Sequence, residues 1–387
     1  MISFDDTQTA FVSKSDSDLK KSYFLFKLIS KPLLVKYGGN LAPLGLKIGF
    51  KGLIKSTIFK QFVGGEDIKD CNNAISQLGK YNIGTILDFS VEGKENESDF
   101  DACCKETIET IHRAKGDKNI PFCVFKVTGL ARLAILEKVT AKQVLTKEET
   151  EEYARVKERV NKICKEAHDN NTPIFIDAEE SWIQQAIDDL ANENMARYNK
   201  NAPIVYNTFQ LYRNDRLDYL KQSFENGKKD GYYLGAKLVR GAYMEKERER
   251  AAKNGYPSPI HEVKEDCDRD YNLALEFCVE HIDRMGLCAG THNEKSSLVL
   301  VDLIQKKNLQ INDKRIYFSQ LLGMSDHISY NLSKNNYNVA KYVPYGPVKE
   351  VLPYLIRRAQ ENTSVKGQTG RELSLIIKEK ERRNNAK

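Results

Sequence analysis

From Tyr81 onward, eight short runs rich in β-branched and aromatic residues alternate with longer charged segments, and this alternation constrains the fold more than any other feature. Such alternation is typical of parallel strands joined by crossover helices. The runs are residues 85–90, 122–128, 174–179, 205–210, 235–240, 288–293, 316–321 and 340–345. Eight strands close a (βα)8 barrel of TIM type, so the sequence predicts an α/β fold of that kind, with a doubly wound open sheet as the alternative.

The segments between the runs have the periodicity of helices. In residues 150–169 and 181–198, apolar residues recur at intervals of three and four and many other positions are charged, as expected of helices that cover a barrel. Two further helical segments, 16–29 and 68–80, lie near the N-terminus.

The two ends of the chain differ from this middle region. We expect residues 1–80, whose helical segments surround a stretch broken by glycine and proline, to form a helical arm. The barrel is expected over residues 81–375, and residues 376–387 are expected to form a charged tail that frays in solvent.

Composition and cysteine spacing exclude several classes of protein. Because the mean hydropathy is -0.54 and no apolar run reaches the roughly 18 residues of a membrane span, we do not expect an integral membrane protein. The net charge of +6 is spread along 387 residues, which argues against nucleic-acid binding. The eight cysteines form no CxxC pair and no cluster with zinc spacing, so no metal site is expected.

Charged and amide side chains end the second, third and fourth runs. Lys126 lies in an apolar strand, where it needs a counter-charge or a ligand unless it snorkels or pairs with a structural carboxylate. Asp177, Glu179 and Glu180 follow the third run, and each can also cap the next helix. Gln210 offers an amide to a ligand or simply satisfies a strand end.

The fifth run, GAKLVRGAY, is the most informative. Strand alternation sends Lys237 to one side and Arg240 to the other. Two cations with no acidic run nearby suggest an anionic ligand, and the small pair Gly241 and Ala242 permits close backbone approach to a phosphate.

Polar residues also follow the sixth and last runs. Thr291 and His292 can hydrogen-bond a ligand, although a lone histidine here is often structural, and no GxSxG elbow supports nucleophilic hydrolysis. Arg357 and Arg358 can each form a fork with a carboxylate. Paired arginines on a solvated helix face are the alternative.

Together these segments resemble the proline dehydrogenase family over residues 56–375. The motifs that carry the resemblance are, in order, FKVTGL, IDAEES, FQLY, AKLVRGAY, THN, FSQLLGM, KYVPYG and YLIRRAQEN. FVGGE and ILDFSVE are similar to the monofunctional branch that includes the mitochondrial enzymes. The resemblance implies FAD bound on a distorted barrel, with a final helix over the barrel mouth.

The resemblance also implies roles for individual residues. Those implied as catalytic are Lys126, Asp177 and Lys237. Those implied to bind substrate are Lys126, Leu238, Tyr243, Leu321, Tyr342, Arg357 and Arg358. Those implied to bind FAD are Asp177, Gln210, Lys237, Arg240, Gly241, Ala242, Thr291, His292 and Glu361. One departure is Lys237, which stands where the fused bacterial enzymes carry an arginine near flavin N5.

The implied reaction is oxidation of L-proline to Δ1-pyrroline-5-carboxylate, the first step of proline catabolism. A hydride leaves ring C5 for flavin N5, and the electrons pass to a membrane quinone. No GxGxxG follows a strand, which argues against a nicotinamide fold. The rivals are a 4-hydroxyproline dehydrogenase of the same fold, disfavoured by the bulk of Tyr342, and a binding protein that has lost catalysis.

The location of the protein is a separate expectation. Neither a secretory signal nor an arginine-rich transit peptide is evident near Met1, which favours the bacterial cytoplasm, or the matrix side of the mitochondrion if the source is eukaryotic. Residues 41–54 mix apolar residues with Lys47 and Lys51, a pattern typical of a segment on a membrane surface or of a buried helix with snorkelling lysines.

Overall fold

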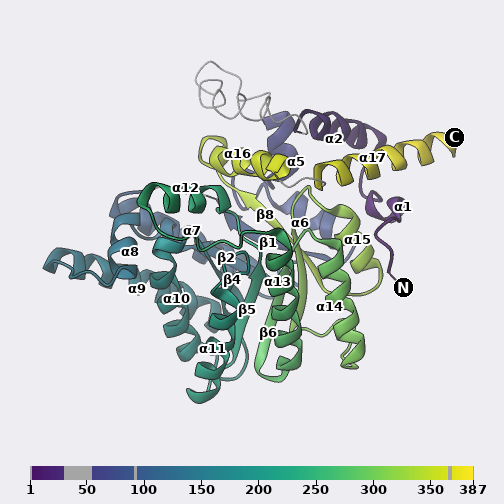
Figure 1. Cartoon of the computed structure of the whole chain (residues 1–387). Coiled ribbons are helices and arrows are strands. Elements are labelled where there is room, and N and C mark those ends of the chain that lie inside the picture. The colour runs from purple at the N-terminus through teal and green to yellow at the C-terminus, as the bar shows by residue number, and fades with distance from the viewer. Residues whose placement is uncertain (1, 30–54, 91–93, 365–367, 387) are drawn as a thin grey trace. The chain divides into compact units, whose positions relative to one another are not determined.

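Eight parallel strands follow one another in a closed barrel, β1 to β8, in the computed structural model (Figure 1). The structure describes residues 2–29, 55–90, 94–364 and 368–386, without the side chains of 55, 56, 359–364, 368 and 369. The strands are β1 (Ile83–Phe89), β2 (Phe122–Lys126), β3 (Ile174–Asp177), β4 (Val205–Gln210), β5 (Leu234–Val239), β6 (Met285–Gly290), β7 (Ile316–Leu321) and β8 (Val339–Tyr345). The predicted (βα)8 barrel is confirmed, and the open sheet is excluded.

β1 and β5 end one residue before their predicted ends, and β2, β3 and β6 end two or three residues before theirs. Side-chain hydrogen bonds follow the ends of these last three strands. The Thr128 N–H donates to the Glu179 carboxylate, so β2 gives way to a 3-10 turn, Val127–Gly129. The Glu179 N–H donates to Gln184, beyond the end of β3. Asn293 caps the helix after β6, so the THN motif lies in a loop and not in the strand.

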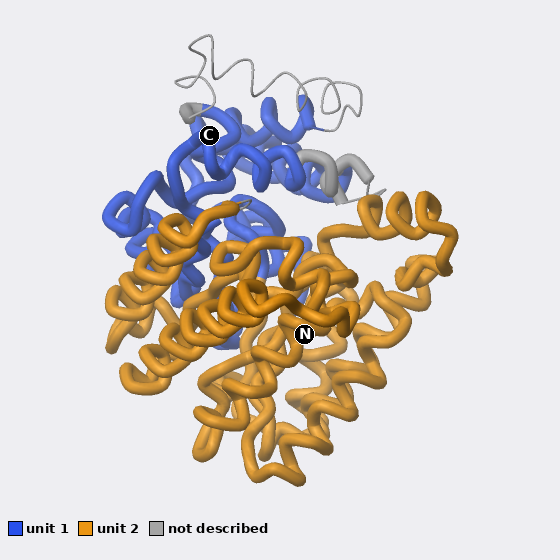
Figure 2. Tube along the Cα trace, turned by 90° about the vertical axis from the view of Figure 1, so that its left-hand side faces the viewer, with its two compact units in different colours: residues 1–90, 320–387 blue, residues 91–319 orange. Residues whose placement is uncertain are grey.

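By their internal contacts the described residues form two units, Met1–Ser90 with Gln320–Lys387, and Val91–Ser319 (Figure 2). The predicted boundaries at residues 80 and 375 stay predictions. The second unit contains the helices α7 (Glu97–Ala114), α8 (Leu133–Thr140), α9 (Lys147–Asp169), α10 (Ser181–Tyr198), α11 (Arg216–Lys229), α12 (Met244–Asn254), α13 (Lys264–Glu280) and α14 (Glu294–Lys306). A capping box of Thr146 and Glu149 starts α9, three residues before the predicted start of that helix.

The first unit contains both ends of the chain. Its helices are α1 (Thr7–Ala10), α2 (Asp16–Ile29), the π-helical turn Lys55–Phe59, α5 (Lys60–Phe62), α6 (Asn72–Gly79), α15 (Asp326–Lys334), α16 (Val348–Ser364) and α17 (Gln368–Asn385). A shared apolar core that includes Phe11, Phe26, Phe62, Val351 and Leu375 joins the N-terminal and C-terminal segments.

The prediction of a frayed C-terminal tail is wrong. Helix α17 continues to Asn385 because Arg383 donates to the carbonyl oxygens of Phe11 and Lys14, at 3.0 and 2.9 Å, and to Asp16 at 2.9 Å. Charge alone predicted solvation, but these partners lie far away in the sequence. The hypothesised membrane segment 41–54, with Lys47 and Lys51, lies outside the described residues. Among the residues that are described, no helix is long and apolar enough to cross a membrane.

Candidate active site

The carboxyl ends of β2, β3 and β5 bring three charged side chains together. Lys126 and Asp177 lie opposite each other in the ladder, with Lys126 Nζ 3.4 Å from Asp177 Oδ2. The Lys237 ammonium donates to Asp177 Oδ1, and its side chain is only 5% exposed. Two ammonium groups therefore face one carboxylate in a buried site, and each of the three predicted catalytic residues contributes one of the charges.

The carboxyl group of Glu179 lies beside this cluster and is almost completely buried. Its Oε1 accepts the backbone N–H of Thr128 at 3.0 Å, and its Oε2 accepts the Thr128 hydroxyl. Burial, assisted by the nearby charge of Glu180, raises the pKa of Glu179 to about 8, although the bonds from Thr128 and the charge of Lys126 lower it. At neutral pH this group mostly holds its proton.

Gln210, the last residue of β4, is oriented by the segment that follows β3. Its Nε2 donates to the Glu179 carbonyl oxygen at 2.7 Å, and both residues are buried. Only the nitrogen of an amide can donate to a carbonyl, so this bond fixes which way the Gln210 amide lies. The amide oxygen and the second N–H are the groups it can offer to a ligand.

Arg240, which follows β5, is held by several groups at once. Its guanidinium donates to Asp268 at 2.6 and 2.9 Å, to the Thr291 hydroxyl at 2.6 Å and to Ser296 at 3.0 Å. Its Cζ also lies 4.4 Å from the centre of the Tyr271 ring. These contacts fix the guanidinium beside the end of β6.

Lys237 and Arg240 have acidic partners, although no acidic run was identified near them in the sequence. Asp177 pairs with Lys237, and Asp268 with Arg240, across 60 and 28 residues of sequence. The argument for an anionic ligand from unpaired charge therefore fails. What these residues still offer is hydrogen-bond donors held in place at the strand ends.

Gly241 has a backbone conformation that favours glycine, with φ of 144°. A Cβ atom built there would lie 2.3 Å from the ring of Tyr212. Glycine is thus required by the packing of an aromatic ring, whether or not a phosphate also approaches.

The remaining predicted residues of this unit lie in and after β5 and β6. Leu238 is fully buried, Thr291 is buried, and Ala242, Tyr243 and His292 are half-buried. Thr291 Oγ1 accepts the Asn293 N–H at 3.1 Å, which ties it to the start of α14.

The other predicted residues belong to the first unit. Leu321 ends β7, and the Leu322 N–H donates to the carbonyl of Tyr342, in the middle of β8, at 2.8 Å, so Leu321 and Tyr342 lie on neighbouring strands. In α16, Arg357 is half-buried and Arg358 is buried, with Arg358 Cζ 5.3 Å from the Tyr354 ring centre.

Two predictions concern parts of the chain that the structure describes incompletely. Glu361 lies in α16, but its side chain is outside the described part. Within the part of the chain that is described, no group of three or more His, Cys, Asp or Glu side chains could hold a metal ion.

Sequence reasoning missed the residues that hold the predicted ones. Thr128 was visible two residues after Lys126, but its partner Glu179 is 51 residues away. Asp268 lies in the acidic run KEDCDRD, which is remote from Arg240 in the sequence. Nothing in the sequence pointed to Gln184, because a single polar residue in a predicted helix is common.

Comparison with known proteins identifies the family. The sequence model described as proline dehydrogenase matches residues 71–371, which include every predicted site residue. The chain belongs to the proline dehydrogenase family. This finding confirms the prediction, made from the strand-end motifs, of an oxidoreductase of this family.

Individual relatives agree with this assignment. Proline dehydrogenase 1, mitochondrial, of Dictyostelium discoideum is 34% identical over 426 residues, covering 98% of this chain and 74% of its own. The carbapenem antibiotics biosynthesis protein CarD of Pectobacterium carotovorum is 30% identical, with 86% of each chain covered. The structure of proline utilization A (PutA) from Bdellovibrio bacteriovorus, inactivated by N-propargylglycine, matches with a TM-score of 0.72 at 20% identity, over 92% of this chain and 38% of that chain. The present chain thus spans little more than a third of PutA, and that likeness shows the fold alone.

Proposed function

We propose that this proline dehydrogenase family member uses FAD to oxidise L-proline to Δ1-pyrroline-5-carboxylate. The observation that carries the proposal is the group formed by Lys126, Asp177 and Lys237, which assembles buried charge at the carboxyl ends of three barrel strands. Ligands of barrel enzymes bind at that end of the strands.

The donor set fits a flavin. Protein groups tune a flavin through charge near the ring and hydrogen bonds to its nitrogens and oxygens. Gln210 supplies an oriented amide, Lys237 a buried ammonium, and Arg240 and Thr291 donors at the neighbouring strand ends. In this proposal Asp177, Gly241, Ala242, His292 and Glu361 complete the cofactor site.

For the substrate, we assign the carboxylate of proline to cationic groups and its ring to apolar ones. Arg357 and Arg358 can each give a two-pronged hydrogen bond to a carboxylate, with Lys126 as an additional cation. The residues assigned to the ring are Leu238, Tyr243, Leu321 and Tyr342.

Oxidation removes a hydride equivalent from ring C5 and a proton from the ring nitrogen, leaving a C=N bond. When bound, FAD supplies the acceptor for that hydride. The chain must bind and orient proline, because correct positioning provides much of the rate. The carboxylate of Asp177 holds the ammonium groups of Lys126 and Lys237 in place, and Glu179, neutral at pH 7, adds no second negative charge there.

Reoxidation of the cofactor by a membrane quinone is part of the proposal. Several relatives carry mitochondrial names, which supports a location on the matrix side of the mitochondrion as part of this proposal if the source is eukaryotic. Peripheral membrane contact through residues 41–54 is testable by replacing Lys47 and Lys51 with glutamine and measuring vesicle binding. Unchanged binding would exclude that segment.

The deciding experiment is an anaerobic visible spectrum of the purified protein before and after addition of L-proline, with trans-4-hydroxy-L-proline in a parallel sample. Loss of the oxidised flavin band with proline alone supports the proposal. Faster loss with hydroxyproline would reassign the substrate. Absence of bound flavin after addition of FAD would contradict the proposal itself.

A further inference from the structure

Gln184, in the first turn of helix α10, is a buried residue that holds the segment after β3. Gln184 is 1% exposed, and its Oε1 accepts the backbone N–H of Glu179 at 2.9 Å. The segment it holds is the one that carries Asp177 and Glu179. The hydrogen bond from Gln184 goes to the backbone of Glu179, so its influence on this segment is exerted through the backbone.

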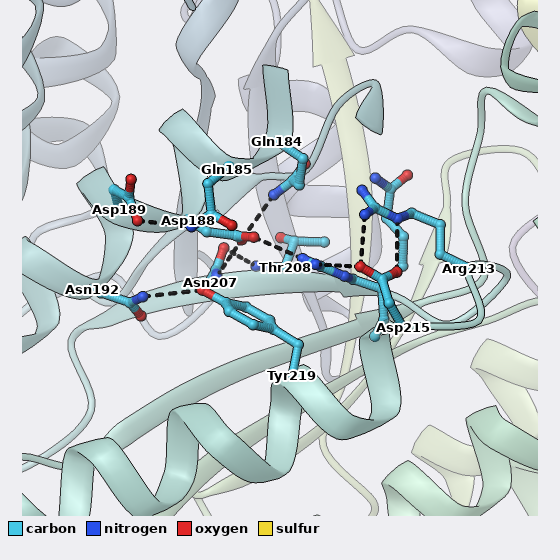
Figure 3. Close-up of polar contacts among 12 residues, drawn as sticks. Gln184, Gln185, Asp188, Asp189, Asn192, Asn207, Thr208, Arg213, Asp215 and Tyr219 are labelled. Atoms are coloured by element: carbon cyan, nitrogen blue, oxygen red, sulfur yellow. Dashed lines mark hydrogen bonds and ion pairs between the residues drawn. The ribbon is translucent and has the colours of Figure 1, made fainter. Parts of the chain in front are cut away.

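The orientation of the Gln184 amide is fixed by a second hydrogen bond, to Asp188. Its Nε2 donates to Asp188 Oδ1 at 2.9 Å, one turn further along α10 (Figure 3). Asp188 is fully buried and also accepts hydrogen bonds from Asn207 Nδ2 at 2.9 Å and from Arg216 Nη1 at 2.7 Å. Because a carboxylate can only accept, Gln184 must turn its nitrogen to Asp188 and its oxygen to Glu179.

The segment after β3 is also linked to β4, through Gln210. The Glu179 carbonyl, one residue's length from the N–H that Gln184 holds, accepts the Nε2 of Gln210 at 2.7 Å. A shift of the Glu179 backbone would therefore displace or rotate the Gln210 amide. Three hydrogen bonds thus link four buried residues, from Asp188 through Gln184 and Glu179 to Gln210.

We infer that Gln184 is a positioning residue, which sets the direction in which Gln210 presents its amide to the flavin. The inference rests on the proposed FAD site. Gln184 holds the backbone of Glu179 in place, so that Gln210 can offer the flavin its amide oxygen and second N–H.

The neighbouring glutamine provides a matched control. Gln185 makes the same bond one position along, from its Nε2 to Asp189 Oδ1 at 2.8 Å (Figure 3). Unlike the bond from Gln184, this one is solvent-exposed. Gln184→Met and Gln185→Met remove the same chemical group from the same helical turn. Only the first leaves a buried N–H, that of Glu179, without its acceptor.

The experiment measures the FAD dissociation constant and the visible spectrum of the bound flavin for the wild type and both variants. We expect Q184M to weaken FAD binding by about tenfold, comparable to the loss of one hydrogen bond, and to shift the flavin band. Q185M should match the wild type. In a Gln210→Met background, Q184M should have little further effect, because both act on one contact.

Each result has a defined meaning. If the wild type binds no FAD, the proposed function fails. If the wild type binds FAD and Q184M behaves as Q185M does, or if the effects of Q184M and Q210M simply add, the positioning role is refuted. Q184A, measured in parallel, removes the same acceptor without burying a thioether, so the test does not depend on the folding of one variant.

Discussion

The ring of Tyr212 packs so closely on the backbone of Gly241 that a Cβ atom at residue 241 would lie 2.3 Å from it. The positive φ of Gly241 adds a second obstacle to any side chain. We therefore expect Gly241→Ala to destabilise the protein by more than ~2 kcal/mol, from overpacking plus backbone strain, and to weaken FAD binding, since Arg240 precedes Gly241. Urea unfolding and FAD titration measure both effects.

Gly255 provides the control for that substitution. It also has a positive φ, 70°, but in the described part of the chain no heavy atom beyond Gly255 and its two chain neighbours lies within 4 Å of the position that a Cβ atom would take there. Gly255→Ala should therefore show only the strain of about 1 kcal/mol. Equal losses of stability in G241A and G255A would mean that the Tyr212 ring moves aside and that its packing does not require glycine at residue 241.

The proton of Glu179 should make the stability of the protein depend on pH. Its pKa is raised to about 8 in the folded chain, from 4.5, mainly by burial. Between these values the unfolded chain loses the proton while the folded chain keeps it, so this group lowers stability by up to about 1.4 kcal/mol per pH unit as pH rises. Above pH 8 the slope from this group ends.

Glu179→Gln should remove that slope, because glutamine resembles the protonated acid and can still accept from Thr128 N–H and donate to its hydroxyl. The free energy of unfolding, measured by urea titration at several values between pH 5 and pH 8.5, should fall less steeply for E179Q than for the wild type. Parallel pH profiles for the two proteins would show that Glu179 is ionised in the folded state.

Strand positions could be predicted from the sequence because β-rich runs depend on local residue types. β4, β7, α2 and α10 begin and end where predicted. The early ends of β2 and β3 could not be predicted, since the N–H groups of Thr128 and Glu179 bond to side chains, and the loop after β6 leads to Asn293, which caps α14.

For the candidate site, the types of the charged residues could be predicted from the sequence, but not which of them pair with one another. Lys126, Asp177 and Lys237 could be selected as charges at strand ends, but which carboxylate faces which lysine depends on the barrel register. The prediction of a frayed C-terminal tail was wrong for the same reason, because nothing near Arg383 in the sequence indicates that its side chain bonds to the carbonyl of Phe11.

The assignment of the proline carboxylate to Arg357 predicts a change in substrate affinity. Arg357→Met keeps the aliphatic part of the side chain and removes the fork, so KM for proline should rise by one to two orders of magnitude, roughly the 1.5–3 kcal/mol of a charged hydrogen bond, with little change in FAD affinity. Arg371→Met, which breaks an exposed pair with Asp5, should leave both unchanged. An unaltered KM in R357M would place the carboxylate elsewhere.

A buried ion pair in the first unit should dominate the stability of its core. Lys341, in β8, is fully buried and lies 2.9 Å from Asp326 Oδ1. Burial opposes the charge of Asp326, but Lys341 and then Lys14 outweigh it and keep the pKa of Asp326 below its usual value. Replacing Lys341 by methionine, which has a similar length, removes the larger of the two lysine contributions and leaves the buried carboxylate with the more distant Lys14, whose Nζ lies 3.5 Å from Asp326 Oδ2.

We expect Lys341→Met to cost about 3–5 kcal/mol of folding free energy, because removing one partner of a buried pair strands the other charge. Lys334→Met removes the exposed pair with Asp6, at 3.1 Å, and should cost no more than about 1 kcal/mol. Lowering the pH should protonate the stranded Asp326 and narrow the difference between K341M and the wild type. Thermal melts at pH 5 and pH 7.5 test this, and similar losses for K341M and K334M would mean that water reaches Asp326 once the lysine is gone.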